Sequence, residues 1–297
     1  MSIRISITGV LGSGKSSVCR ELQSRRHLEF FSTGAIQRHI AAEKGMSTYE
    51  LNRYSERHPE IDRLIDDKLI ALSDASVDMV IDSRMAWHFV SNSFKVFLTT
   101  DEIVAARRIM GDERGCSETY ASLAEAKEKL DARKKSENLR YKSKYGVDCN
   151  DFRNYDLVVD TSDISTAAVA EHILTQFEQR QAGKPYPIFW ISPKCLYPTK
   201  GITEISDAIA DEYAAVDVLV SNGRFYIFDG HHRTAARIRR GDPLIPCHMV
   251  AQDEDEVIGG VSADRYAAKE FSLTKAADWE AFNNLRYYSY PGCNSEQ

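Results

Sequence analysis

Short apolar runs alternate with longer stretches of helical composition through the first 180 residues. The apolar runs predict strands, and the stretches between them predict helices. The expected strands cover residues 4–8, 30–31, 79–81, 95–98 and 157–159, and the expected helices cover residues 15–24, 34–45, 47–56, 59–74, 102–110 and 164–179. Strands that alternate with helices indicate a parallel sheet with helices on both faces. Residues 1–180 are therefore expected to form a three-layer α/β/α domain.

The pattern changes where Gly183, Pro185 and Pro187 interrupt the chain after the last of these helices. Glycine and proline at such a position are typical of a linker between domains. Beyond them, the pair Asn222-Gly223 separates two strand-like runs, which is a hairpin signal. A smaller α+β domain with a C-terminal extension is therefore expected in residues 186–297.

Composition narrows the class of protein. With 297 residues, 43% of them hydrophobic and 28% charged, the chain is an ordinary globular one of a size that suits two domains. Its formal net charge of −6 argues against a protein that coats nucleic acid, which usually needs a basic face. No apolar stretch is long enough to span a membrane, and the first apolar run is too short for a signal peptide. Six cysteines without a C-x-x-C pair are typical of free thiols in a reducing compartment, so we expect a cytoplasmic protein.

The C-terminal tail is rich in aromatic residues, among them Trp279, Phe282 and the cluster Tyr287-Tyr288-Ser-Tyr290. Aromatic side chains pack cores more often than they stack on bases. The tail is therefore expected to pack against one of the two domains or against the second subunit of a homodimer.

Residues 9–16, Gly-Val-Leu-Gly-Ser-Gly-Lys-Ser, match the P-loop pattern G-x-x-x-x-G-K-[ST] in full. Glycines let the backbone turn its N–H groups toward phosphate oxygens, and the helix that follows adds its positive end. Lys15 would reach the β- and γ-phosphates of ATP, and Ser16 would ligate Mg²⁺. The residues expected to bind ATP are Gly9, Gly12, Ser13, Gly14, Lys15, Ser16 and Ser17. Because the guanine-reading tetrapeptide N-K-x-D does not occur, the motif favours a small-molecule kinase over a GTPase.

Two residue groups are candidates for holding the phosphoryl acceptor. Ser32 and Arg38 lie at a hydroxyl-rich helix start, which can bind a phosphate through backbone donors and a guanidinium group. The alternative there is an ordinary N-capped helix. Asp82 and Arg84 follow the strand at residues 79–81, where a carboxylate would support Mg²⁺ and its water shell and an arginine would pair with a phosphate. The alternative there is a solvated turn at the strand end.

Residues 103–146 form a net basic segment in an acidic protein. Its arginines are Arg107, Arg108, Arg114, Arg133 and Arg140, and several lysines accompany them. A mobile lid that carries arginines would close over the transferred phosphoryl group and exclude water. The alternative is a solvated helix whose carboxylates pair with lysines four residues away. The carboxylates in question are Glu125, Glu128, Asp131 and Glu137.

Seven segments resemble the archaeal-type cytidylate kinases in order and spacing across residues 1–165. They are the P-loop, Ser32-Thr-Gly with Arg38, and residues 44–52, 60–62, 82–87, 140–148 and 155–161. The resemblance implies that Arg38 and Arg84 grip the acceptor nucleotide. It also implies that Arg133 and Arg140, with Arg107 or Arg108, are cations of the lid. Asp82 stands where relatives tend to have glutamate, which keeps the carboxylate but shortens its reach. The expected catalytic residues are Lys15, Arg133, Arg140 and Asp82, with Asp82 acting on Mg²⁺ through water.

In the second half, Asp229-Gly230-His231-His232-Arg233 resembles the ParB/sulfiredoxin superfamily, and the likeness covers residues 186–255. A strand-to-helix turn here would place backbone donors, imidazoles and a guanidinium group around an anion, such as a phosphate of CTP or ADP. Sulfiredoxins carry a cysteine where His231 stands, which argues against that activity. A branch that phosphorylates free serine tends to carry a glutamate where Lys200 stands, and Glu204 is a candidate substitute. A tight turn with surface histidines is the alternative.

Together these features predict a two-domain enzyme that transfers the γ-phosphoryl group of ATP to a nucleoside monophosphate, with CMP or dCMP as the first candidates. The second domain is expected to bind a nucleotide. One alternative is a kinase of another small hydroxyl compound, such as free serine or a specialised metabolite. The other is a ParB-like, DNA-associated regulator switched by nucleotide, which the net charge and the lack of an evident helix-turn-helix disfavour.

Overall fold

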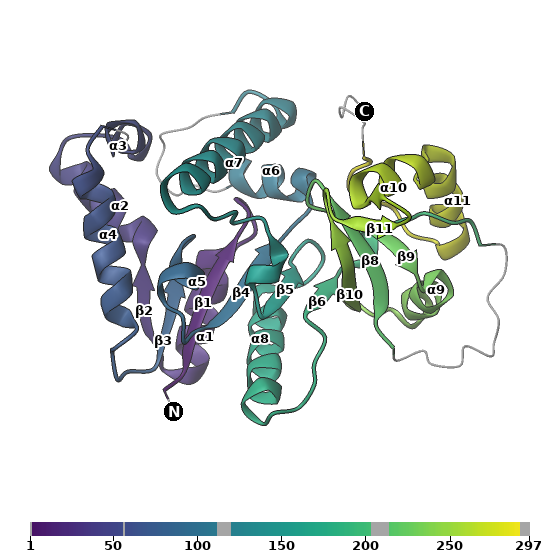
Figure 1. Cartoon of the computed structure of the whole chain (residues 1–297), viewed down its shortest axis with the longest axis horizontal. Helices are drawn as coiled ribbons and strands as arrows, with labels where there is room; N and C mark the ends of the chain where they lie inside the picture. The colour runs from purple at the N-terminus through teal and green to yellow at the C-terminus, as the bar shows by residue number, and fades with distance from the viewer. Residues whose placement is uncertain (1, 56, 112–119, 203–213, 292–297) are drawn as a thin grey trace.

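One continuous sheet of ten strands runs through the part of the chain that the structure describes (Figure 1). The computed structural model describes residues 2–55, 57–111, 120–202 and 214–291. Five parallel strands make up the N-terminal half, in the order β2-β3-β1-β4-β5. Their bounds are β1 Arg4–Gly9, β2 Glu29–Ser32, β3 Met79–Asp82, β4 Phe94–Thr99 and β5 Leu157–Asp160. Because β1 lies between β3 and β4, the carboxyl ends of these three strands meet at one edge of the sheet, where such folds bind ligands.

Helices cover both faces of this half. The helices α1 (Lys15–Arg26) and α8 (Thr166–Gln181) pack on one face, and α4 (Pro59–Leu72) and α5 (Ala86–Phe89) pack on the other. Side chains alternate between the faces along each strand. In β3, for example, Val80 belongs to the core beneath α1 and α8, whereas Met79 and Ile81 belong to the core beneath α4 and α5. The predicted three-layer α/β/α arrangement is confirmed.

Two further groups of helices border the carboxyl edge of the strands. The helices α2 (Thr33–Glu43) and α3 (Thr48–Ser55) form a lobe with α4 around a small core of Ile40, Leu51 and Ile61. The helix α6 (Glu102–Met110) packs against the long helix α7 (Leu123–Tyr145), which crosses above the ends of the strands (Figure 1). The side chain of Ser122 caps α7, and Gly146 ends it in a left-handed conformation.

The C-terminal half extends the same sheet in the order β6-β10-β8-β9-β7. The strand bounds are β6 Phe189–Ile191, β7 Leu196–Pro198, β8 Val216–Ser221, β9 Arg224–Asp229 and β10 Ile245–Gln252, with a separate ribbon of β11 Glu256–Ile258 and β12 Val261–Ser262. The helices are α9 His231–Arg240, α10 Ala263–Glu270 and α11 Leu273–Asn283, and short 3₁₀ turns lie at Phe152–Asn154 and Pro193–Cys195. The predicted hairpin is confirmed, because β8 and β9 pair antiparallel and both turn residues, Asn222 and Gly223, have positive φ angles.

The strand β6 joins the two halves. It pairs parallel with β5 through Phe189 and antiparallel with β10 through Ile191, so the sheet does not break at the expected linker. The aromatic rings of Phe152, Phe189 and Phe225 contact one another across this junction. Residues on both sides of the expected domain boundary, between residues 180 and 186, contribute to one sheet and one hydrophobic core. The division of the chain into two domains at this point therefore stays a prediction.

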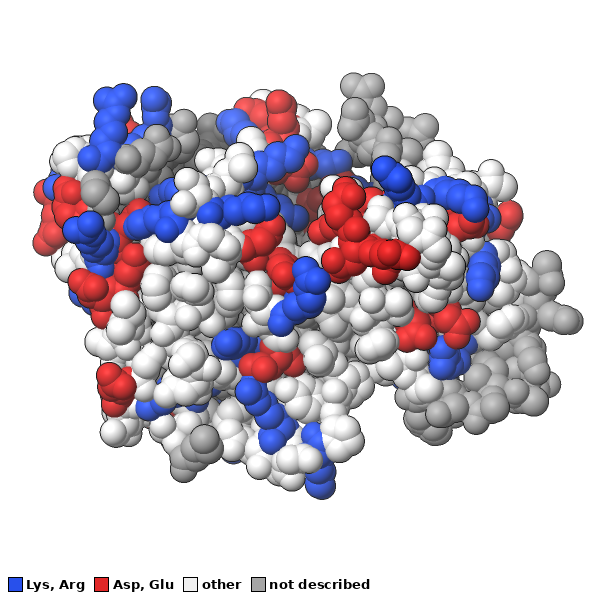
Figure 2. All heavy atoms as spheres, in the orientation of Figure 1, with Lys and Arg blue, Asp and Glu red and all other residues white. Residues whose placement is uncertain are grey.

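The surface charges and the cysteines are those of an ordinary globular chain. On the face shown in Figure 2, the described Lys and Arg side chains are mixed with Asp and Glu. Among the described residues, no helix combines the length and the apolar character needed to cross a lipid bilayer. Cys19, Cys149, Cys195 and Cys247 are buried free thiols, and the remaining two cysteines, Cys116 and Cys293, lie outside the described residues.

Candidate active site

The loop between β1 and α1 has a shape that only glycine permits at two positions. A β-carbon on Gly9 would lie 2.3 Å from the carbonyl oxygen of Leu98, and one on Gly12 would lie 2.7 Å from the backbone of Ala105. Gly12 and Gly14 also have φ angles of 77° and 78°, which side chains disfavour. The loop therefore wraps closely around the start of α1, with its backbone pressed against β4 and α6.

Lys15 reaches back into this loop from the first position of α1. Its Nζ atom donates hydrogen bonds to the carbonyl oxygens of Gly9 at 3.0 Å and Val10 at 3.1 Å. Burial, and then the nearby guanidinium group of Arg84, lower the pKa of Lys15 to about 8, against the opposing effect of Asp82. A phosphate group in the loop would supply the negative charge that this ammonium group lacks.

Ser16 and Asp82 meet at the carboxyl ends of β1 and β3. The Oγ atom of Ser16 donates to Oδ2 of Asp82 at 2.7 Å. A hydroxyl ligand beside a carboxylate is an oxygen-rich arrangement of the kind that Mg²⁺ prefers, so these two residues fit the metal that the P-loop motif implies. Nearby, Ser13 and Thr161 brace the loop: Ser13 Oγ donates to the carbonyl of Val10 at 2.7 Å, and Thr161 Oγ1 donates to the carbonyl of Ser13 at 3.0 Å. Ser17 follows in the first turn of α1, where its N–H bonds the carbonyl of Gly14.

Arg84 lies beside the loop and is tied to α7. Its Nη1 atom is 3.4 Å from the carbonyl oxygen of Gly9, and its Nε atom is 2.8 Å from Oε2 of Glu137. The other carboxylate oxygen of Glu137 is 2.9 Å from Nε of Arg133. Burial alone would raise the pKa of Glu137, but the guanidinium groups of Arg84 and Arg133 hold it below its usual value. Glu137 therefore pairs with arginines and not with the lysines that the helical spacing suggested.

The remaining arginines of the basic segment divide between the loop and the α2–α4 lobe. Arg108 donates to the carbonyl of Gly12 at 3.3 Å and to Thr161, whereas Arg107 is exposed, so the structure brings Arg108 to the loop. Arg140 approaches Ser55 of α3 at 3.4 Å. At the end of α7, Lys144 pairs with Asp62 of α4 at 2.9 Å. Arg114 lies outside the described residues.

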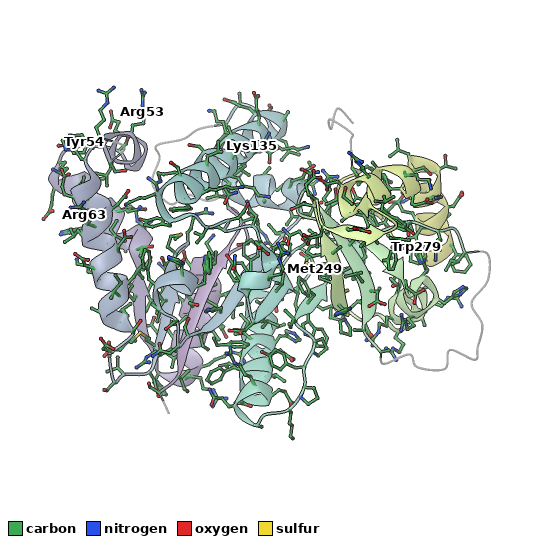
Figure 3. All side chains as sticks on the ribbon, viewed as in Figure 1. Arg53, Tyr54, Arg63, Lys135, Met249 and Trp279 are labelled. Carbon is green, nitrogen blue, oxygen red and sulfur yellow. The ribbon has the colours of Figure 1, made fainter. Side chains whose placement is uncertain are left out.

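Ser32 and Arg38 lie at the start of α2, on the side of β2. The Oγ atom of Ser32 accepts a hydrogen bond from the N–H of Ala35 at 3.3 Å, so Ser32 caps this helix. Arg38 is exposed, and its side chain turns back toward Gly34. A β-carbon built on Gly34 would lie 3.4 Å from the Nη1 atom of Arg38. Within the described part of the chain, neither residue contacts the phosphate loop. Arg38 lies on the lobe of α2, α3 and α4, which Figure 3 marks with the labels of Arg53, Tyr54 and Arg63.

The second predicted motif lies at the turn from β9 to α9. His231 is buried, and its Nε2 atom accepts hydrogen bonds from the N–H groups of Thr199 and Lys200, both at 3.1 Å. Burial, and then the charge of Lys200, lowers the pKa of His231 to about 4, so the ring is neutral and holds the chain that follows β7. His232 and Asp229 are exposed, and Arg233 pairs with Asp229 at 3.2 Å.

This motif and the phosphate loop are at different places. The six residues of β9 separate Gly230 from the hairpin that faces α7, a length of roughly 20 Å at the usual rise per residue. The structure therefore brings Lys15, Ser16, Asp82, Arg84 and Arg133 together and leaves the residues 229–233 as a separate group. Glu204, the candidate carboxylate near this motif, lies outside the described residues.

Comparison with known proteins agrees with this geometry. Residues 4–163 match the model of the cytidylate kinase-like family. Cytidylate kinase of Methanothrix thermoacetophila is 38% identical over 157 residues, which cover 53% of this chain and 87% of that protein. Cytidylate kinase of Pyrococcus abyssi is 35% identical over 166 residues, which cover 56% of this chain and 88% of that protein.

A third relative is a larger protein. The S-adenosylmethionine-dependent nucleotide dehydratase of Lacinutrix mariniflava is 31% identical over 188 residues, which cover 63% of this chain, and the chain spans only 38% of the length of that protein. The family match ends at residue 163, so the ParB/sulfiredoxin likeness of the second half stays a prediction. With a complete phosphate loop at the head of a five-stranded parallel sheet, this chain belongs to the cytidylate kinase-like family of phosphotransferases.

Proposed function

We propose that the N-terminal half transfers the γ-phosphoryl group of ATP to a nucleoside monophosphate, with CMP and dCMP as the first candidates. The observation that carries the proposal is that Lys15 and Arg84 both approach the carbonyl oxygen of Gly9, while Ser16, next to Lys15 in the chain, bonds Asp82. The names of the relatives, two of them cytidylate kinases, support the choice of acceptor.

Each group has a distinct task in this proposal. The loop N–H groups and Lys15 hold the phosphates of the donor, and bound Mg²⁺ would neutralise part of their charge. Ser16 and Asp82 would hold that ion directly and through water. Arg84 and Arg38 would bind the acceptor phosphate, and Arg133 and Arg140 of α7 would supply positive charge to the transferred group when substrates are bound. Because the transition state spreads charge over the phosphoryl oxygens, positioned cations supply most of the rate enhancement.

An acceptor panel tests this function. Labelled ATP is incubated with the full chain and with CMP, dCMP, UMP, AMP, free serine and other small hydroxyl compounds, and phosphorylated products are separated. We expect transfer to a pyrimidine monophosphate and loss of at least about a thousandfold of that rate in Lys15→Ala. Transfer that survives in Lys15→Ala would assign the chemistry to the second half. Transfer only to a hydroxyl compound that is no nucleotide would replace the proposed acceptor.

For the second half we propose a nucleotide-phosphate site at residues 229–233, with CTP or ADP as the ligand. The support is local: Gly230 is the N-cap of α9, no side chain of the described residues caps that helix, and His231 fixes the backbone of Lys200 beside the helix start. Calorimetry of CTP with the full chain carrying Lys15→Ala, which impairs the phosphate loop without adding a competing nucleotide, tests the site. An affinity for CTP that Arg233→Ala leaves unchanged would contradict it.

A further inference from the structure

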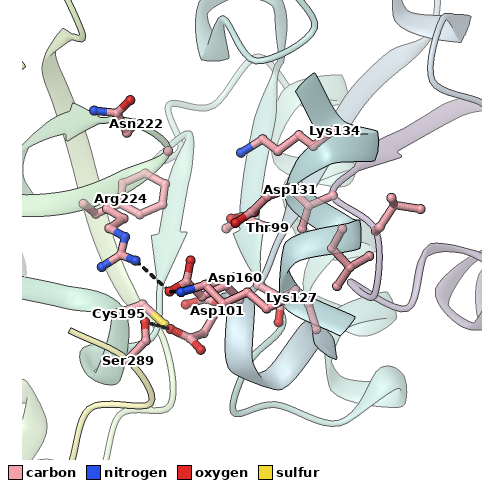
Figure 4. Close-up of a pocket in the computed structure, with 18 of the residues that line it drawn as sticks. Thr99, Asp101, Lys127, Asp131, Lys134, Asp160, Cys195, Asn222, Arg224 and Ser289 are labelled. Carbon is pink, nitrogen blue, oxygen red and sulfur yellow. Dashed lines mark hydrogen bonds and ion pairs between the residues drawn. The ribbon is translucent and has the colours of Figure 1, made fainter. Parts of the chain in front are cut away.

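A cavity lies between the two halves, next to the carboxyl ends of β4 and β5 (Figure 4). Its walls come from the phosphate loop and the start of α6, from α7, and from the hairpin that joins β8 to β9. Its volume is about 140 Å³, which is similar to that of an apolar protein cavity known to take up benzene. The cavity therefore has room for a small metabolite.

Two cations on opposite walls share one carboxylate. Oε1 of Glu102 lies 2.8 Å from Nζ of Lys127 on α7 and 2.7 Å from Nη2 of Arg224 on β9. The Nη1 atom of Arg224 is buried and has no hydrogen-bond partner among the described residues. Glu102 thus joins α7 to the C-terminal half, and its single negative charge is shared by two cations.

Lys134 adds a third cation. Figure 4 shows its side chain extending from α7 toward the hairpin that carries Asn222 and Arg224, and a β-carbon built on Gly223 would lie 3.4 Å from its Nζ atom. Within the described ranges, no hydrogen bond or ion pair joins this ammonium group to another residue. Burial lowers the pKa of Lys134, against the charges of Asp131 and Asp253. The side chain of Lys134 is only partly buried, and its ammonium group would gain an ion pair from an anion bound in the cavity.

The carboxylates of Asp101 and Asp160 do not supply that anion, because neutral donors already occupy their oxygens. Asp101 accepts from the N–H of Ile103 and from Ser289 Oγ, at 2.8 and 2.6 Å. Asp160 accepts from the N–H groups of Ser162 and Ser192, at 2.9 and 3.2 Å. Asp131, one helical turn before Lys134, is the described carboxylate of the cavity that keeps its acceptors unused.

We propose that this cavity binds a small metabolite whose carboxylate or phosphate group contacts Lys134, with a hydroxyl or amino group of the same ligand donating to Asp131. Such a ligand supplies the anion that Lys134 lacks and the donor that Asp131 lacks. Because Lys134 belongs to α7 and the opposite wall belongs to β9, an occupied cavity connects α7 with the C-terminal half. The site adjoins the phosphate loop at Val10 and Leu11, but Lys134 and Asp131 are not among the residues proposed to hold ATP, so the proposal does not depend on which acceptor the enzyme uses.

The experiment titrates inorganic phosphate and acetate, in separate series, into the full chain at constant ionic strength in chloride, and follows binding by ligand-observed NMR. Saturating ADP fills the phosphate loop, and each series is repeated without ADP. We expect at least one of the two anions to bind the wild-type chain. Lys134→Met weakens that binding at least tenfold. Lys135→Met removes the same charge from the next, exposed residue of α7 (labelled in Figure 3) and leaves the affinity unchanged.

The two probes separate a carboxylate-bearing ligand from a phosphate-bearing one. Equal affinity in Lys134→Met and Lys135→Met overturns the proposal, as does the absence of binding of both anions to the wild type. A wild-type signal that ADP abolishes belongs to the phosphate loop and also counts against the cavity. Circular dichroism checks that each variant is folded.

Discussion

The Nε atom of Arg84 lies 2.8 Å from the Oε2 atom of Glu137, so the arginine that follows β3 is bound by a carboxylate of α7. The other oxygen of Glu137 binds Arg133. Two arginines that are expected to hold phosphate groups therefore share one protein anion. A bound phosphate competes with that carboxylate for the same guanidinium groups, which makes Glu137 a positioning residue for substrate binding.

Substitution of Glu137 by glutamine should free both arginines for the substrate. The neutral amide keeps the size of the side chain but loses the charge that competes with phosphate. We expect the KM for the nucleoside monophosphate to fall about fivefold, which corresponds to roughly 1 kcal/mol. Steady-state kinetics with varied acceptor measures this. The control is Glu128→Gln, an exposed residue of the same helix, which should leave KM unchanged. A rise in KM in Glu137→Gln would show that the carboxylate orients the arginines and does not compete for them.

Asp82 should determine how much Mg²⁺ the enzyme needs. Its Oδ2 atom accepts from Ser16 Oγ at 2.7 Å, and groups that hold a metal ligand usually contribute ten- to a hundredfold to metal affinity or activity. In Asp82→Asn we expect the Mg²⁺ concentration for half-maximal rate to rise about tenfold or more. Titration of Mg²⁺ at fixed, saturating ATP measures it.

Asp82→Glu is the matched variant, because it keeps the charge and extends the reach by one methylene group. It should keep the Mg²⁺ requirement within about threefold of the wild type. If Asp82→Asn and the wild type require the same Mg²⁺ concentration, then Asp82 acts only as the partner of Ser16 and has no part in metal binding.

Local sequence predicted the parts of the site that depend on backbone geometry. The phosphate loop could be predicted from eight consecutive residues. Two of them, Gly9 and Gly12, must be glycine because β4 and α6 approach the loop closely. The hairpin at Asn222-Gly223 could be read in the same way, since both positions need positive φ angles. In each case the residues that determine the shape are neighbours in the chain.

Contacts between distant residues could not be read in this way. Arg84 and Glu137 are far apart in the sequence, and helical spacing pointed Glu137 toward lysines of its own helix. The strand β6 has only three residues and follows Pro187, so the pattern suggested a linker where the structure continues the sheet. His231 was expected to face an anion, but its Nε2 atom is used by the backbone of Thr199 and Lys200, which no local pattern reveals.

The affinity for nucleotide should decrease in alkaline solution because of Lys15. Its pKa is about 8 in the free protein, so the ammonium form predominates below pH 8 and is lost above it. Bound phosphates favour the charged form and raise this pKa, so binding above pH 8 must take up a proton. We expect the affinity for ADP to fall by up to about tenfold per pH unit above pH 8. Calorimetry in two buffers of different ionisation enthalpy should detect the proton uptake.

Lys15→Met is the control for this dependence. It should bind ADP more weakly at every pH and show no proton uptake between pH 8 and 9.5, because the titrating group is gone. A wild-type affinity that stays constant over this range would mean that Lys15 remains charged in the free protein, contrary to the effect of its burial.

Acid should destabilise the chain partly through His231. Its pKa is about 4 in the folded protein and 6.5 for the unperturbed group, because burial disfavours the charged ring. The unfolded chain therefore binds a proton more readily, so the stability from this group is complete above pH 6.5 and is lost as the pH falls toward 4. The loss amounts to at most roughly 3 kcal/mol. Urea unfolding at pH 7.5 and pH 5 should show a smaller difference in His231→Gln than in the wild type. His232→Gln, a substitution of the exposed neighbour, should keep the wild-type difference. If all three proteins lose the same stability between these pH values, the acid sensitivity comes from other groups, such as the half-buried His172, whose pKa burial also lowers to about 4.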